Sequence, residues 1–173
     1  MDEGTRLLLQ ARDGNRLALA EFVRRSQPEI WRLCVHLVGR DDADDATQET
    51  FVAAWRSVST FRAESSARTW LFVIARRTCE RIGRRHIRWR SLADGAARPI
   101  AGPSPERATE LELMLASLDS DRRLALVLTQ IIGLSYDEAA EVCECAVGTI
   151  RSRVARARGD LLRLDREWQA EPG

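Results

Sequence analysis

Arginine side chains carry most of the chemistry that this sequence offers. All 27 basic residues are arginine, and none of the 173 residues is lysine. A guanidinium donates in a planar fork that matches a phosphate or the edge of a guanine base. Residues 61–98 hold 10 arginines against 3 acids and residues 146–173 hold 6 against 4, whereas residues 99–145 hold 3 against 9. The net charge of +1 therefore conceals two basic segments that suit a polyanion, with acidic stretches left for another partner.

The basic segment near the C-terminus has the spacing of an amphipathic helix. Its predicted buried stripe consists of Ile150, Val154, Ala157 and Leu161. The residues that this stripe turns outward are Thr149, Arg151, Ser152, Arg153, Arg156 and Arg158. A solvated arginine-rich helix is the simpler interpretation. However, a helix at 136–143 with the capping pair Ser135 and Glu138, and a short turn at 144–146, come directly before it. Two helices joined in this way indicate a helix-turn-helix that binds DNA.

The other basic segment interleaves aromatic residues with arginines between Arg62 and Arg90. A groove that neutralises phosphates and offers stacking faces is what single-stranded or melting DNA requires. The alternative is that Trp70, Phe72 and Ile74 are core and that the arginines only solvate the helix, and for Trp70 the core is favoured. The better candidates for contact with DNA are Arg84, Arg85 and Trp89.

No set of residues in the chain is typical of a catalytic or metal site. The two histidines leave little for acid–base chemistry, and there is no glycine-rich phosphate loop and no nucleophile beside a base. The four cysteines lack paired CxxC spacing; Cys34 and Cys79 fall at apolar helical positions, while Cys143 and Cys145 form a close pair for which a redox role stays open. We therefore expect a protein that is not an enzyme, with no cofactor and no metal.

The chain also lacks a signal peptide and an apolar run long enough to cross a membrane, which predicts a cytoplasmic protein without membrane insertion. The acids around residues 41–51 complement the start of a helix and are not joined by His or Cys, so a metal site is rejected there. On that helix a polar face lies opposite a core stripe of Thr47, Phe51, Ala54 and Val58. This face suits a protein interface as well as water, and consists of Asp45, Gln48, Glu49, Val52 and Arg56.

The elements that must position these residues are helices. Before residue 90 we expect them near 3–13, 15–26, 28–38, 43–57 and 66–88, with Asn15 as a cap and Pro28 in a first turn. After residue 105 we expect them near 106–118, 120–132, 136–143 and 147–166. Residues 91–105 hold three of the five prolines and read as a linker. The sequence thus predicts an all-α fold of two small helical domains, 1–90 and 106–173, joined by a flexible linker at 91–105.

Three stretches in this order resemble the extracytoplasmic-function group of bacterial sigma factors, in the sigma-70 family. They are DADDATQETFVAAWR at 42–56, TFRAESSARTWLFVIARR at 60–77 and GLSYDEAAEVCECAVGTIRSRVARARGDL at 133–161. The resemblance covers nearly the whole chain. It implies a sigma region 2 helical bundle in the first domain and a sigma region 4 helix-turn-helix in the second. It also implies a factor that binds core RNA polymerase and directs promoter-specific initiation.

The resemblance further implies residue roles. Contact with the β′ clamp helices of the polymerase would fall to Asp45, Gln48, Glu49 and Val52. Unstacked bases of the −10 element would be trapped by the loop at 59–64 and the following helix, through Phe61, Arg62, Arg76, Arg77, Arg81, Arg84, Arg85 and Arg88. Phe61 is the candidate for the wall of a base pocket. Duplex DNA of the −35 element would be read by Val147, Thr149, Arg151, Ser152, Arg153, Arg156 and Arg158. The acidic start of the second domain would meet the β flap, and an anti-sigma factor is a further candidate partner.

Two departures from the family pattern bear on these roles. Members often have proline before the Val-Gly-Thr of the recognition helix, where this chain has Ala146, which predicts a less rigid turn. The residues after Ile-Ala-Arg are here Arg77, Thr78 and Cys79, which leaves the −10 sequence preference open. The alternative hypotheses are a polymerase-independent helix-turn-helix regulator, which leaves the 62–90 segment unexplained, and an enzyme with a DNA-binding tail, which lacks a catalytic constellation.

Overall fold

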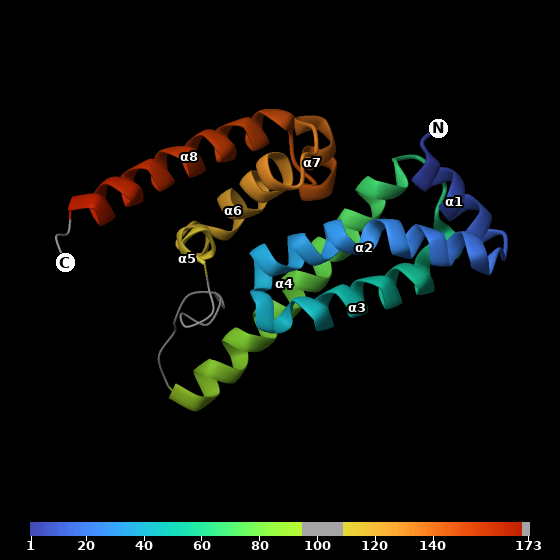
Figure 1. Cartoon of the computed structure of the whole chain (residues 1–173), viewed down its shortest axis with the longest axis horizontal. Helices are drawn as coiled ribbons and strands as arrows, with labels where there is room; N and C mark the ends of the chain where they lie inside the picture. The colour runs from blue at the N-terminus through green and yellow to red at the C-terminus, as the bar shows by residue number, and fades with distance from the viewer. Residues whose placement is uncertain (95–108, 171–173) are drawn as a thin grey trace.

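The computed structural model describes residues 1–94 and 109–170, with side chains described for all of these except 86–94 and 167–170. Every regular element in the described ranges is helical, which confirms the predicted all-α class. Figure 1 shows two groups of helices, α1 to α4 and α5 to α8, lying against each other. Residues 91–94 still belong to α4, so the helix runs past the predicted start of the linker, and residues 95–105 of that linker lie outside the described ranges.

The N-terminal domain consists of α1 (Glu3–Arg12), α2 (Arg16–Val38), α3 (Arg40–Ser57), the short 3₁₀-helix η1 (Val58–Thr60) and α4 (Ala67–Asp94). Local caps set these boundaries. The side chain of Asn15 accepts from the N–H groups of Leu17 and Ala18, which confirms the predicted cap. The Ser66 hydroxyl accepts from the N–H of Thr69 at the start of α4. Gly39, at φ +91°, makes the sharp bend between α2 and α3 that a residue with a Cβ rarely adopts.

Pro28 lies inside α2, so the prediction of a helix boundary there was wrong. A proline in a helix interior removes one backbone hydrogen bond and crowds the preceding turn. In this helix the side chains on both sides of it, Phe22 before and Ile30 and Leu33 after, are buried in the same core. Packing of this face outweighs the local cost, because most of the stability of a helix in a protein comes from tertiary packing of its apolar face.

The C-terminal domain consists of α5 (Glu110–Ala116), α6 (Ser120–Leu126), the π-helical turn η2 (Val127–Ile131), α7 (Tyr136–Cys143) and α8 (Val147–Ala170). The capping box of Ser135 and Glu138 is present as predicted, with N–H to side-chain distances of 2.8 and 3.1 Å. A second capping box, of Thr109 and Glu112, starts α5 later than the predicted residue 106, and residues 106–108 are outside the described ranges. Capping by Thr109 explains the difference, since its hydroxyl accepts from the orphan N–H of Glu112 in the first turn.

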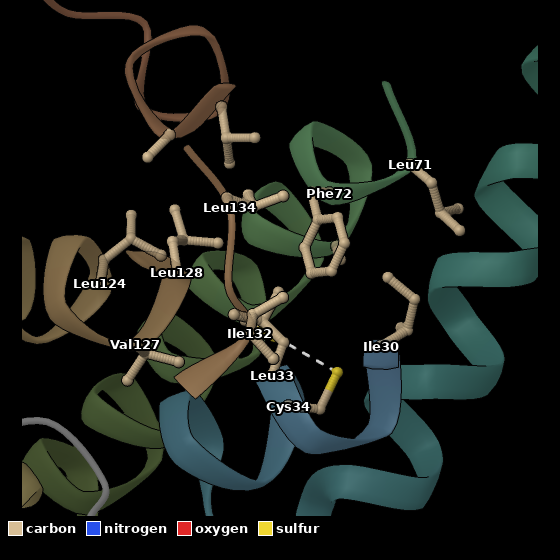
Figure 2. Close-up of a cluster of buried hydrophobic side chains, with 14 of the residues drawn as sticks. Ile30, Leu33, Cys34, Leu71, Phe72, Leu124, Val127, Leu128, Ile132 and Leu134 are labelled. Carbon is tan, nitrogen blue, oxygen red and sulfur yellow. Dashed lines mark hydrogen bonds between the residues drawn. The ribbon is translucent and has the colours of Figure 1, made fainter. Parts of the chain in front are cut away.

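The apolar core is continuous between the two domains. Buried residues from α2 and α4, such as Leu33 and Phe72, belong to the same cluster as Leu128 and Leu134 from the C-terminal half. Figure 2 shows these side chains facing one another. The domains therefore pack through hydrophobic contact and not only through surface charges.

No helix in residues 1–94 or 109–170 is long and apolar enough to cross a membrane.

Candidate nucleic-acid interface

The helix-turn-helix is built by α7, a tight turn and α8. Glu144 closes α7 in the left-handed conformation at φ +53°, and the N–H of Cys145 donates to the carbonyl of Ala140 at 3.0 Å. On α8 the predicted inward residues Ile150, Val154 and Ala157 are at most 2 % exposed. Burying this stripe fixes the rotation of α8, so its opposite face must point to solvent.

The predicted DNA-reading residues of α8 divide into two groups. Arg151, Ser152, Arg156 and Arg158 are exposed, whereas Val147, Thr149 and Arg153 are half-buried. Arg153 forms an ion pair with Asp121 of α6, and Arg158 donates to the side-chain oxygen of Gln130 at 2.6 Å. Within the described part of the chain, Arg151 and Arg156 pair with no residue. These two guanidinium groups are therefore the ones already free for an outside ligand.

The long helix α4 carries the second basic face. Arg77, Arg81, Arg84 and Arg85 are all exposed, with side-chain exposures between 50 and 69 %. Their spacing puts them on one side of the helix over about two turns. Arg88 lies further along α4, among the residues whose side chains are not described. The sequence and the structure thus agree on a run of guanidinium groups along one helix face.

Beside the start of α4 the loop at 60–65 encloses an open hollow of about 380 Å³. Phe61 is only 3 % exposed, and its ring packs on Trp70 with centroids 5.3 Å apart. It therefore contributes to the wall of the hollow but does not project from the surface. Arg62 lines the hollow from the exposed side. Ala63 is held at φ +56°, which is unusual for a residue with a Cβ and keeps the loop tightly curved. An aromatic wall beside a guanidinium is suited to holding a planar base.

Arg76 does not share the exposure of its neighbours. Its side chain is 13 % exposed and lies between the domains, paired with Glu80 at 3.0 Å and with Glu144 at 3.1 Å. Glu144 pairs with Arg77 as well. The pKa of Glu144 is lowered, first by hydrogen bonding to Arg77 and then by the charges of Arg76 and Arg77. The turn of the helix-turn-helix therefore sits on the basic helix of the other domain.

Two further contacts hold the domains together. Arg68 of α4 forms a two-pronged hydrogen-bonded pair with Glu29 and also donates to the carbonyl of Ile132 at 3.1 Å. Arg40, at the start of α3, pairs at 3.0 Å with Glu112, whose side chain is 4 % exposed. Sequence reasoning missed these roles, because the partners are far apart in the chain.

The predicted protein-binding face lies on α3 of the first domain. Asp45, Gln48 and Val52 are exposed, with Val52 at 43 %. Glu49 is half-buried and pairs with Arg81 and Arg85 of α4, so it already joins this face to the basic one. Sequence reasoning missed Trp55, which is 51 % exposed, although its position three residues after Val52 places it on the same face.

Trp31 of α2 extends this apolar and acidic surface. Its indole N–H donates to the Asp44 carboxylate at 2.8 Å, and its side chain remains partly exposed. Exposed tryptophans with satisfied polar ends are typical of protein interfaces. The α3 surface thus combines exposed apolar side chains with charged ones. In the described ranges no three His, Cys, Asp or Glu residues come together as a metal site.

Comparison with known proteins shows which family has these two domains. Residues 22–90 match the model of Sigma-70 region 2, and residues 108–161 match that of Sigma-70, region 4. The chain is 48 % identical over 166 residues to the ECF RNA polymerase sigma factor SigC of Mycobacterium tuberculosis, covering 91 % of this chain and 89 % of that protein. The chain belongs to the extracytoplasmic-function sigma factors. It is therefore an RNA polymerase sigma factor, which directs transcription to promoters.

Solved structures agree with this assignment. The sigma factor is similar to CnrH in complex with the cytosolic domain of CnrY, with a TM-score of 0.75, 30 % identity and coverage of 94 % of this chain and 97 % of that one. It is also similar to the sigma factor RpoE in complex with the anti-sigma factor NepR from Bartonella quintana, with a TM-score of 0.72, 31 % identity and coverage of 85 % and 96 %. Both similarities extend over the two domains of the sigma factor.

Proposed function

We propose that this sigma factor reads promoter DNA at two places and holds the polymerase at a third. In the proposal α8 reads the −35 element as duplex, α4 and the loop at 60–65 take melted bases of the −10 element, and α3 binds the β′ clamp helices. The observation that carries it is that the chain has two exposed arginine faces, one on a helix-turn-helix and one beside an aromatic-walled hollow. Duplex and unstacked DNA need these two different kinds of surface.

At the −35 element, the N-terminal half of α8 enters the major groove. Arg151 and Arg156 reach base edges or flanking phosphates, because neither is engaged by a described residue. The Ser152 hydroxyl donates to the Thr149 carbonyl at 2.9 Å and keeps lone pairs that can accept from a base. The edges of this contact are supported by Val147, Thr149, Arg153 and Arg158. Arg153 releases Asp121, and Arg158 releases Gln130, as they engage DNA.

At the −10 element, a base leaves the stack and enters the hollow beside Phe61 and Trp70. Arg62 lies at this hollow, and the phosphates that follow run along Arg77, Arg81, Arg84 and Arg85, with Arg88 continuing the same face. Arg76 joins them only after the Glu144 turn has moved away. The two domains therefore separate when the factor engages a promoter, since Arg76 and Arg77 are paired with Glu144 in the closed arrangement.

On the polymerase side, Asp45, Gln48, Glu49 and Val52 meet the clamp helices, and Trp55 adds an apolar anchor. The acidic start of the second domain, with Asp119 and Asp121, faces the β flap. The factor carries out no chemistry of its own, uses no cofactor, and works in the cytoplasm with the polymerase. A polymerase-independent regulator is not retained, because the family membership accounts for both domains.

An anti-sigma protein is a further proposed partner. The solved structure of the Bartonella quintana RpoE contains the anti-sigma factor NepR, and that of CnrH contains the cytosolic domain of CnrY. Both proteins are similar to this chain over most of its length. A protein that inserts between α4 and α6 would keep the arginines of both domains from DNA at the same time.

The test of the proposal is in vitro transcription with purified core polymerase on a pool of genomic promoters, with and without the sigma factor. We expect new start sites and co-elution of the factor with core. Transcription that is unchanged by the factor, together with failure to co-elute, would overturn the proposal.

The residue assignments are tested by Arg151→Ala, with Arg166→Ala as the matched control on the same helix. Loss of a base contact costs about 1–3 kcal/mol, so −35 duplex binding by the holoenzyme should fall at least about fivefold in Arg151→Ala. Arg166→Ala removes the same charge far from the turn and should leave binding unchanged. Core binding, measured by co-elution, should survive both changes. An equal effect of the two substitutions on promoter affinity would contradict the assignment to α8.

A further inference from the structure

Two cysteines that the DNA and polymerase surfaces do not use meet in the core of the first domain. The Cys79 thiol on α4 donates to the sulfur of Cys34 on α2, with the two Sγ atoms 3.7 Å apart. Cys34 is 0 % exposed and Cys79 is 3 % exposed. A disulfide requires an S–S distance of roughly 2.05 Å, so the sulfurs have to approach by roughly 1.6 Å.

The surroundings make this pair chemically distinct from the other two cysteines. The hydrogen bond from Cys79, and secondarily one from Thr47, lowers the pKa of Cys34. The pKa of Cys79 is raised, because its proton is held between the two sulfurs and burial disfavours the charged form. Desolvation raises the pKa of Cys143 to about 12. A thiolate is the reactive form of cysteine, so Cys34 is favoured as a nucleophile over Cys143.

A small molecule has a route to the pair. Cys79 lines a cavity of about 300 Å³ that lies between α4, the end of α2 and the start of α6. Arg76 and Arg84 line the same cavity and provide donors for a polar reactant. The volume exceeds by several times the roughly 30 Å³ that a water molecule occupies, and a peroxide is only slightly larger. The thiol pair is therefore covered by side chains, but Cys79 adjoins a mainly apolar cavity with charged residues in its lining.

We propose that Cys34 and Cys79 are a modification site at which a hydroperoxide forms a disulfide between α2 and α4. In the first step a thiolate sulfur attacks the peroxide, the O–O bond breaks, and sulfenic acid forms with release of water or an alcohol. In the second step the other thiol attacks the sulfenic sulfur, the S–S bond forms and water leaves. The two thiols lose two electrons and two protons, and the peroxide takes up both. Whichever sulfur reacts first, its partner is already in contact, so the second step is intramolecular.

The bond would tie together two helices that carry different functions. Cys79 lies on the buried side of α4, the helix that carries the basic face, and Cys34 lies in α2, which packs against α3. Cross-linking residues 34 and 79 removes conformational freedom from the unfolded chain and so stabilises the first domain. In a reducing compartment the bond would be transient, because thiol exchange reverses it.

The test treats the full-length folded chain with hydrogen peroxide, alkylates the remaining thiols and maps peptides without reduction. We expect the peptide containing Cys34 joined to the peptide containing Cys79, reversal by dithiothreitol, and a rise in Tm of roughly 5 °C or more. A matched double variant, Cys143→Ala with Cys145→Ala, should form the same link.

Three results would overturn the proposal: both thiols alkylated as before, a link only between Cys143 and Cys145, or a link that appears only after unfolding in urea. Because the mapping uses the unaltered chain, it does not depend on whether Cys34→Ala or Cys79→Ala folds. Where those variants fold, as judged by circular dichroism, peroxide should no longer raise their Tm. A Tm gain that persists in Cys79→Ala would also count against this site.

Discussion

Single residues of the same type have different roles according to their surroundings. Arg151 and Arg153 are two positions apart on one helix and are equivalent by composition. In the folded chain Arg151 is exposed, while Arg153 is half-buried against Asp121 and near the Cys145 sulfur at 3.8 Å. In the proposed −35 contact, Arg151 would therefore be available to DNA at once, whereas Arg153 would have to exchange Asp121 for a DNA partner. Such an exchange reduces the net gain, because the existing ion pair is lost.

Cys143 offers a prediction at this scale. Burial raises its pKa to about 12, compared with about 8.5 for a free thiol. At pH 8 the thiolate fraction of Cys143 in the folded chain should thus be lower by roughly a thousandfold, and alkylation by iodoacetamide should slow accordingly. The measurement is the rate of modification of the Cys143 peptide by mass spectrometry, with the urea-unfolded chain as control. Equal rates in the folded and unfolded chains would show that Cys143 is not buried as described.

At the scale of elements, local signals and packing compete to set the helix boundaries. The cap at Asn15 and the capping box of Ser135 and Glu138 are confirmed, because a side chain that satisfies orphan N–H groups acts over a few residues and needs no tertiary partner. At Pro28 the local preference of proline for a helix start did not set the boundary. The helix continues through the proline because Phe22 and Ile30 are buried in one core.

Pro28 leads to a prediction about stability. Its side chain is exposed, so replacing it should disturb no packing. Pro28→Ala restores a backbone N–H in the interior of α2 and relieves crowding of the preceding turn, and should stabilise the first domain by about 1 kcal/mol or more. Thermal unfolding followed by circular dichroism would measure this as a rise in Tm. A control, Gln27→Ala, changes the neighbouring exposed position without altering the backbone and should have little effect. A lower Tm in Pro28→Ala would mean that the proline shapes the helix in a way that packing requires.

At the scale of the whole molecule, the closed arrangement of the domains limits what the basic faces can reach. Glu144 covers Arg76 and engages Arg77, Arg68 holds the carbonyl of Ile132, and apolar residues of both domains share a core. Promoter contact by Arg76 and by α8 together requires these contacts to give way. Binding of polymerase and DNA can provide the free energy for this, since each ligand favours the open form by its differential affinity.

The Glu144 contacts predict a pH dependence of closure. The folded-state pKa of Glu144 is lowered. The stabilisation that its carboxylate gives to the closed arrangement is therefore fully present above the unfolded pKa of about 4.3, and it is lost as the pH falls through the folded-state pKa. Glu144→Gln removes the charge at every pH. The measurement is Förster resonance energy transfer between fluorophores attached to the two domains. Transfer at pH 7 should be more efficient in the unaltered chain than in Glu144→Gln, because the domains of the unaltered chain stay closer together.

Below about pH 4 that difference should shrink, because the carboxylate of the unaltered chain becomes protonated. Glu141→Gln, at an exposed acid on the helix that Glu144 closes, is the matched control and should behave as the unaltered chain does. Energy transfer that is identical in Glu144→Gln and the unaltered chain at pH 7 would show that this ion-pair cluster does not hold the domains closed.

Much about this protein follows from its sequence without a structure. Helical periodicity placed Ile150, Val154 and Ala157 inside α8 and Arg151 and Arg156 outside, because the rotation of a helix is set by the residues that it must bury. Three motifs in order indicated the sigma-70 family, which the comparisons show. These are properties of short stretches of chain, so they can be predicted from short stretches.

Contacts between distant segments were decided only by the tertiary structure. Arg76 was grouped with the other arginines of α4, yet it is covered by Glu144, 68 positions away along the chain. Cys34 and Cys79 were each expected in the core, but no periodicity relates α2 to α4 and none could bring their sulfurs to 3.7 Å. Such pairs depend on how helices cross and which small residues let them approach, and that choice is made by the packing of the whole core.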